Sequence, residues 1–165
     1  MTAYNIVHIF PNERNHGLNG YSEVIESLEW GLNKLGHEVF SSKNTILPDA
    51  KNIVLGAQML SPSAISELPP GSIIYNLEQV RNLSLAEVRE SIKCLALSNK
   101  HIELWDYSSG NLDTWKLLGR QKVVHLPICY SPNLTRISAD NEEEIDVLIY
   151  GLTNELRLGM FHTLS

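Results

Sequence analysis

The sequence has little cysteine, no cluster of positive charge and no long apolar run. Its 165 residues include two cysteines, Cys94 and Cys129, which form no CxxC pair. We therefore expect neither a disulfide framework nor a zinc site. The histidines lack carboxylate or cysteine partners at metal-ligand spacing, so no metal is predicted. Thirteen basic residues against nineteen acidic ones give a net charge of −6, which argues against nucleic acid and anionic membranes as partners.

No apolar stretch approaches the roughly 18 residues that a membrane-spanning helix needs. The first ten residues are too short and too uncharged for a signal peptide. We therefore expect a soluble, cytoplasmic protein without a membrane span. A hydrophobic content of 43% over 165 residues is enough for a single good core.

Two common chemical motifs are also missing. The glycine loop Gly17-Leu-Asn-Gly20 lacks the G-x-G-x-x-G spacing of a dinucleotide site, and the serines at 108 and 109 lack the G-x-S-x-G elbow of a hydrolase. The glycine loop nevertheless lies between a predicted strand and its helix, where backbone amides can hold an anion. Gly17, Asn19 and Gly20 are therefore candidate ligand contacts. The alternative is that the glycines only form the turn.

Short apolar runs alternate with amphipathic segments along the chain, which predicts an α/β fold. Strands are predicted at residues 4–10, 37–40, 52–56, 72–77, 102–106, 122–126 and 145–150. Helices are predicted from Ser22, as the N-cap, to Leu35, and at 62–68, 84–98, 111–118 and from about 154. This order indicates a three-layer, Rossmann-like parallel sheet with a trailing strand and helix. We expect a domain over 1–126, a linker over 127–144, and in 145–165 either the start of a second domain or an association tail.

Two of the predicted strands end in polar residues. Ser72-Ile-Ile-Tyr-Asn-Leu-Glu-Gln79 and Ile102-Glu-Leu-Trp-Asp-Tyr-Ser-Ser109 each begin apolar and finish with amides, a carboxylate or hydroxyls. Open α/β sheets bind ligands just past the carboxyl ends of their strands. We therefore predict one cleft at the ends of strands 4–10, 72–77 and 102–106. Its candidate ligand-binding residues, besides the glycine loop, are Asn76, Gln79, Trp105, Tyr107, Ser108 and Asn111.

Glu78 and Asp106 are the candidate catalytic residues of this cleft. A carboxylate at a strand end can accept the proton of a hydroxyl group, and two neighbouring carboxylates can raise one another's pKa. The alternative is that these side chains cap the following loops. We expect Trp105 and Tyr107 to take opposite faces of their strand, one in the core and the other free to stack on a sugar or base.

Several of these segments together resemble a bacterial glycosyltransferase-like family of the GT-B type. The segments are Leu35-Gly-His-Glu-Val39, Tyr75-Asn-Leu-Glu-Gln79, Trp105-Asp-Tyr-Ser108 with Asn111, Leu126-Pro-Ile-Cys-Tyr-Ser-Pro132 and Asp146-Val-Leu-Ile-Tyr-Gly151. The resemblance implies two Rossmann-like domains that face a cleft. The N-terminal domain would bind a small-molecule or glycan acceptor, and the C-terminal domain a nucleotide-sugar donor. It also implies that no cofactor or bound metal is needed.

The resemblance covers only the N-terminal half of that family's protein. Asn154-Glu-Leu-Arg157 is similar to the start of the second domain's first helix, and the sequence ends soon afterwards. We therefore expect the acceptor-side half of a glycosyltransferase-like protein, which transfers no sugar as an isolated chain. Two alternatives remain: a non-enzymatic module that binds a ligand or self-associates, and a different small-molecule transferase on a similar sheet.

The last segment also predicts self-association. Ile145, Val147 and Ile149 alternate on one face of their predicted strand, and a mostly apolar helix face follows. Such a surface favours association when it has no partner within its own chain. We therefore expect a homodimer through residues 145–165. The alternative is a monomer whose tail folds back onto its own sheet.

Overall fold

The computed structural model describes residues 2–10, 20–80, 90–97, 101–136 and 159. Contacts along the chain divide it into two units, Met1–Thr135 and Arg136–Ser165. The strand predicted at 145–150, the helix predicted from 154 and the dimer contact predicted through 145–165 lie outside the described residues. The dimer therefore stays a prediction. No helix among the described residues is long and apolar enough to cross a membrane.

The described residues form one sheet of six parallel strands, in the order β2-β1-β3-β4-β5-β6. The strands are β1 (Ala3–His8), β2 (Glu38–Lys43), β3 (Lys51–Leu55), β4 (Ile73–Asn76), β5 (Glu103–Asp106) and β6 (Val124–His125). This confirms the predicted α/β, Rossmann-like parallel sheet. The central strands carry continuous apolar runs because both of their faces are covered: in β3, Ile53 and Val54 belong to different core clusters.

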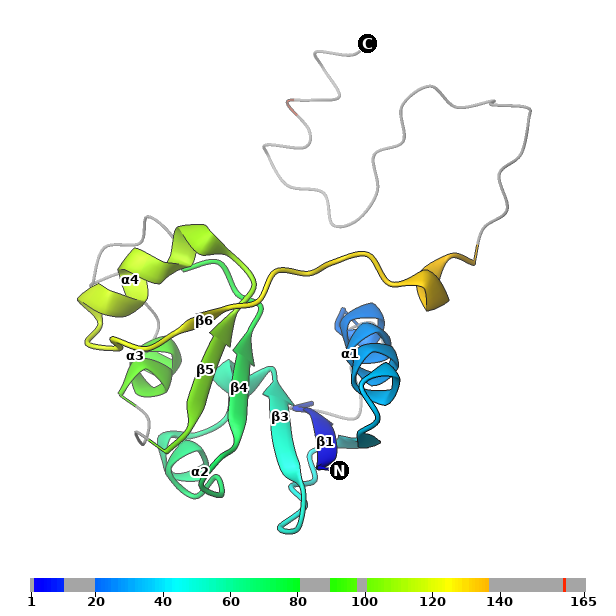
Figure 1. Cartoon of the computed structure of the whole chain (residues 1–165). Helices are drawn as coiled ribbons and strands as arrows, with labels where there is room; N and C mark the ends of the chain where they lie inside the picture. The colour runs from blue at the N-terminus through cyan, green and yellow to red at the C-terminus, as the bar shows by residue number, and fades with distance from the viewer. Residues whose placement is uncertain (1, 11–19, 81–89, 98–100, 137–158, 160–165) are drawn as a thin grey trace. The chain divides into compact units, whose positions relative to one another are not determined.

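Helices cover both faces of the sheet (Figure 1). The helix α1 (Ser22–Lys34) lies on one face, where its apolar residues pack against Ile6, Ile53 and Tyr75. The opposite face is covered by α2 (Pro62–Ser66), α3 (Glu90–Ala96) and α4 (Leu112–Leu117). Their side chains close a larger cluster around the fully buried Trp115.

The ends of these elements follow local chemistry, with small shifts from the predicted bounds. Ser22 is the first residue of α1 and Tyr21 takes the N-cap position without a side-chain hydrogen bond, so the predicted serine cap is wrong. The helix is followed by Gly36, whose φ of +79° suits glycine. In α2, the side chain of Ser61 accepts a hydrogen bond from the backbone of Ala64, as an N-cap does.

Residues 127–135 of the predicted linker belong to the first unit. Leu126 donates its backbone N–H to the Asp106 carbonyl, at an N···O distance of 2.8 Å, and its own carbonyl accepts from the Tyr75 hydroxyl at 2.8 Å. Beyond it, Ser131 is buried, and the Asn133 amide donates to the Glu26 carbonyl of α1 at 3.2 Å. The first unit therefore extends past residue 126, where the sequence predicts that the domain ends.

Candidate functional site

The strand order places the switch point of the sheet at β1. The chain passes from β1 to β2 on one side and then returns to β3 on the other side. Ligands of open α/β sheets bind outside the carboxyl ends of the strands at such a point. Because β3 lies between β1 and β4, the residues that follow β3 belong to this edge as well. The sequence-based cleft omitted them.

Three side chains meet at this edge, and we call them the carboxyl-edge cluster: Tyr21, Gln58 and Glu78. The Gln58 amide donates to Oε1 of Glu78 at 2.9 Å and to the Tyr21 hydroxyl oxygen at 3.1 Å. The Tyr21 hydroxyl in turn donates to the same Glu78 oxygen at 3.4 Å. Oε2 of Glu78 has no hydrogen bond to any described residue. The half-buried carboxylate is thus held by one oxygen and presents the other.

The phenol of Tyr21 stays protonated in this arrangement. Burial raises its pKa above the ordinary value of 10.0, and the nearby charge of Glu78 acts in the same direction. The hydrogen bond from Gln58 works against this rise but does not reverse it. Tyr21 therefore serves the cluster as a neutral hydrogen-bond donor.

His8, the last residue of β1, lies beside the cluster. Its ring packs edge-on against those of Tyr21 and Phe10, with centroid distances of 5.3 and 5.0 Å. Burial lowers the pKa of His8, and the charge of Lys43 lowers it further, so the imidazole is neutral at pH 7. Asn44 holds Phe10 in place because its side chain accepts from the Phe10 N–H at 2.6 Å and donates to the Phe10 carbonyl at 2.9 Å.

Gly56 allows the turn after β3 to bring Gln58 to this edge. Its φ is +79°, which side-chain-bearing residues rarely adopt. A Cβ atom here would lie 3.1 Å from the carbonyl oxygen of Ile9 and 3.4 Å from the Tyr21 ring. The absence of a side chain therefore lets the backbone pass close to β1 and to the cluster.

Asp106 is enclosed by donors and fully buried. Its Oδ1 accepts from the Ser108 backbone at 2.8 Å and from the Asn111 amide at 3.0 Å. Its Oδ2 accepts from the Asn76 amide at 2.8 Å and from the Trp115 indole at 2.6 Å. With both oxygens occupied and no solvent exposure, the carboxylate cannot accept a proton from a ligand. We therefore assign Asp106, Asn76 and Asn111 a structural role in place of the catalytic and ligand-binding roles predicted for them.

This buried network also positions Glu78. The amides of Asn76 and Asn111 each donate to the Glu78 backbone carbonyl at 2.9 Å. Asn111 further accepts from the Val80 N–H at 3.1 Å. The turn after β4 is thereby tied to the end of β5, so that the Glu78 side chain reaches Gln58 and Tyr21. Asn111 thus links the two predicted catalytic residues, but Asp106 anchors the buried network while Glu78 presents its carboxylate at the carboxyl-edge cluster.

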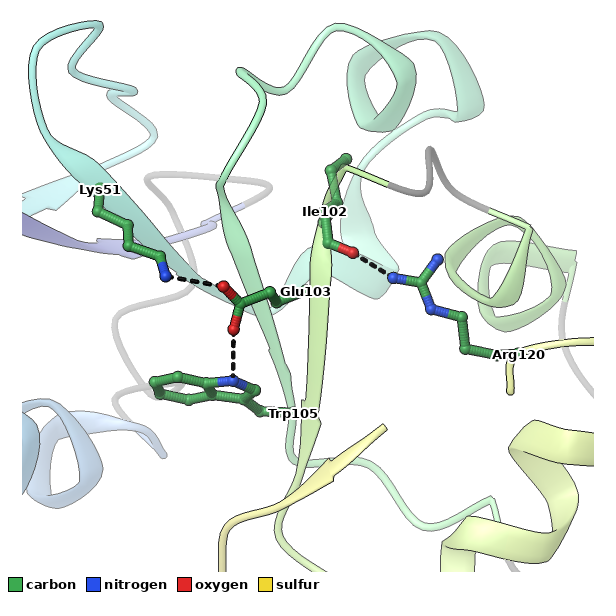
Figure 2. A network of polar contacts seen from close by, with 5 residues as sticks. All are labelled: Lys51, Ile102, Glu103, Trp105 and Arg120. Atoms are coloured by element: carbon green, nitrogen blue, oxygen red, sulfur yellow. Dashed lines mark hydrogen bonds and ion pairs between the residues drawn. The ribbon is translucent and has the colours of Figure 1, made fainter. Parts of the chain in front are cut away.

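Trp105 and Tyr107 lie on the same face of the sheet. Both pack against the cluster around Ile73 and Tyr75, so the prediction that they take opposite faces is wrong. Side chains two residues apart in an extended chain point the same way. The Trp105 indole also donates to Glu103 at 3.3 Å, and Glu103 pairs with Lys51 at 2.8 Å (Figure 2). Trp105 is thus committed to packing and to a structural network.

The remaining predicted residues are scattered around this edge. Ser108 directs its backbone to Asp106, while Gln79 and Gly20 are exposed. Gly17 and Asn19 lie outside the described residues. Among the residues that the structure describes, no group of three or more His, Cys, Asp or Glu side chains is arranged to hold a metal ion.

Sequence reasoning missed three members of this edge: His8, Tyr21 and Gln58. One signal was available for Gln58, because the strand at 52–56 is also apolar and is followed by the polar residue of Gly56-Ala-Gln58. His8 and Tyr21 gave none without the strand order. Comparison of the chain with protein-family models, with curated proteins and with solved structures finds no match.

Proposed function

We propose that this domain binds a small hydroxyl-bearing acceptor at the carboxyl-edge cluster and that Glu78 is its general base. The domain would be the acceptor-side half of a glycosyltransferase-like protein that uses a nucleotide-sugar donor. The observation that carries this proposal is the Glu78 carboxylate. One of its oxygens is held by Gln58 and Tyr21 at the switch point, and the other is left to accept a proton.

The chemistry needs one base at this position. The acceptor hydroxyl gives its proton to Oε2 of Glu78 while its oxygen forms a bond to the anomeric carbon of the donor sugar. The bond from that carbon to the nucleoside diphosphate breaks, and the diphosphate leaves with the bonding electrons. Gln58 and Tyr21 hold the carboxylate in one orientation throughout.

Both described cysteines are free thiols, which supports placing this function in the reducing cytoplasm.

A second candidate is a module that binds the same kind of ligand without transferring sugar. The enclosure of Asp106 favours it, because only one of the two predicted carboxylates is then left at this edge for chemistry. In this case, Glu78 serves as a hydrogen-bond acceptor for a ligand hydroxyl. The two candidates share the site and differ only in turnover.

The test compares Glu78→Gln with Glu67→Gln, a matched change at the exposed residue that follows α2. Ligand-observed NMR with a panel of neutral monosaccharides measures binding to the chain. Release of nucleoside diphosphate from UDP-, GDP- and dTDP-sugars measures transfer by the native gene product. If Glu78 is the base, Glu78→Gln lowers transfer about 10²- to 10⁴-fold and changes acceptor affinity far less.

Each outcome decides between the readings. Saturable binding that Glu78→Gln weakens, without transfer by any preparation, supports the binding module over the enzyme. Transfer that survives Glu78→Gln at the level of Glu67→Gln rules out Glu78 as the base. If no acceptor binds the chain at millimolar concentration, both candidates fail.

A further inference from the structure

A hollow lies on the face of the sheet that carries α3 and α4, beside the starts of β5 and β6. Its volume is about 750 Å³, within the range of roughly 300–1,000 Å³ that small-molecule sites occupy. It is lined by the end of α3, by residues 102–104 and by the turn from α4 into β6. The carboxyl-edge cluster follows the opposite ends of the strands, so the two sites are separate.

The walls of this hollow are aliphatic. Ala96, Ile102 and Leu104 are buried side chains of the main core cluster and form its inner wall. Leu97 and Val124 also line it and are 75% and 49% exposed. None of the described residues that line the hollow is aromatic. The surface therefore suits an aliphatic chain rather than a base or a sugar that stacks on rings.

Positive charge is placed along one side of the hollow. Arg120 and Lys122 both belong to the turn from α4 into β6 that lines it. The Arg120 guanidinium donates to the Ile102 carbonyl, which holds it against the start of β5 (Figure 2). A guanidinium held in this way remains charged at any physiological pH.

The one acidic residue that lines the hollow is turned away from it. Glu103 directs its carboxylate to the other side of β5, where it bonds to Lys51 and Trp105 (Figure 2). Alternation along the strand explains this, because Leu104 faces the hollow while Glu103 and Trp105 face the sheet's opposite side. Among the described residues, the lining of the hollow thus combines an aliphatic wall with basic side chains, and the carboxylate of Glu103 faces away from it.

We propose that this hollow binds a free, single-chain aliphatic carboxylate. The chain lies on Ile102 and Leu104, and the carboxylate lies beside Arg120 and Lys122. This proposal does not depend on the acceptor site or on glycosyl transfer. Both the aliphatic lining and the sign of the charge are needed for it, and each can be tested alone.

The first experiment titrates the whole chain with dodecanoate below its micelle concentration, using calorimetry. We expect saturable binding with one ligand per chain. Octanoate and decanoate should bind progressively more weakly, since each CH₂ group buried changes the dissociation constant by up to about fourfold. Dodecyltrimethylammonium, which has the same chain and the opposite charge, should not bind measurably.

The second experiment uses two leucines that match in exposure. Leu97 and Leu117 are both 75% exposed at the ends of neighbouring helices, but only Leu97 lines the hollow. We expect Leu97→Glu to weaken dodecanoate binding at least about tenfold, because it sets a like charge beside the ligand. Leu117→Glu should leave it unchanged. Lys122→Glu is a second rim variant and should weaken it as well.

Four results would overturn the proposal. The first is the absence of saturable dodecanoate binding. The second is equal binding of dodecyltrimethylammonium. The third is an equal effect of Leu97→Glu and Leu117→Glu on dodecanoate binding, in variants with wild-type melting temperatures. The fourth is capture of the chain by anionic phospholipid vesicles without binding of monomeric dodecanoate, which would identify a membrane surface in place of a free carboxylate.

Discussion

Replacing Asp106 by Asn separates a structural role for this residue from a catalytic one. The carboxylate is fully buried and receives hydrogen bonds from four donor groups: Ser108 bonds to Oδ1, Asn76 and Trp115 bond to Oδ2, and Asn111 bonds to both oxygens. Asparagine keeps the shape but has one oxygen and one NH₂ group. An NH₂ group in the place of Oδ1 meets the Ser108 N–H, and one in the place of Oδ2 meets the Asn76 amide and the Trp115 indole. Asn111 reaches both positions, so the change leaves one or two donors without an acceptor. If Asp106 holds β4, β5 and α4 together, this change must cost stability.

The magnitude follows from the number of stranded donors. A buried donor left without an acceptor costs about 1–3 kcal/mol, so the loss of one or two acceptors costs about 1–6 kcal/mol. A domain of this size is stable by only about 5–15 kcal/mol. Asp106→Asn should therefore remove a large part of the free energy of unfolding while leaving the folded state measurable.

Urea denaturation followed by circular dichroism measures the effect. The matched control is Asp113→Asn, the same change at an exposed residue of α4 that pairs only with the nearby Lys116, and it should fall within the error of the measurement. If the free energy of unfolding of Asp106→Asn lies within about 1 kcal/mol of the wild-type value, the four donors do not enclose the Asp106 carboxylate. Asp106 would then return as a candidate base.

Two further predictions follow from the same edge of the sheet. Burial, and then the charge of Asp106, raises the pKa of Tyr75 to about 12. The Tyr75 hydroxyl therefore stays protonated in the folded state at pH values where the unfolded chain already ionises it, from about pH 10. The stability that this difference contributes is fully present below about pH 10 and is lost as the pH rises toward 12. Ultraviolet titration of the phenolate should show a late transition that Tyr75→Phe removes, and its persistence would contradict the assignment. Gly56→Ala should destabilise the fold by about 1–3 kcal/mol, because φ is positive and the new Cβ lies 3.1 Å from the Ile9 carbonyl oxygen. The control in thermal melts is Gly36→Ala, because Gly36 has the same φ of +79° but a Cβ there would meet no atom within 4 Å. If both variants lower the melting temperature equally, crowding at Gly56 contributes nothing to the destabilisation.

Much of the fold was predictable because burial on both faces leaves a mark on the sequence. The runs around Ile53 and Ile73 are continuous and apolar, and they form central strands. The apolar residues Val24, Leu28 and Leu32 recur at helical spacing and pack against the sheet, whereas Leu35, which continues the same spacing, is exposed. These features depend on neighbours within a few residues, so the chain itself carries the information. Strand boundaries shifted by up to three residues, because the end of a strand depends on its partner strand, which lies far away in the sequence.

The candidate site was predicted only in part. The polar strand ends led to Glu78 and to the network of Asn76, Asp106 and Asn111. They did not show which carboxylate would be enclosed, because that depends on Trp115, nine residues along the chain from Asp106, closing over it. A strand end rich in polar residues predicts equally well an open site and a buried network.

The sequence by itself thus determined the class of fold, the six strands that the described residues form and the presence of polar side chains at two strand ends. Only the tertiary structure decided the strand order, and with it the position of the switch point between β1 and β3. The physical reason is that the order depends on the side to which the chain turns after β2, and hence on packing between segments far apart in sequence. That turn brings Gln58 beside Glu78, 20 residues later, and Tyr21, 37 residues earlier. No local pattern records such a meeting.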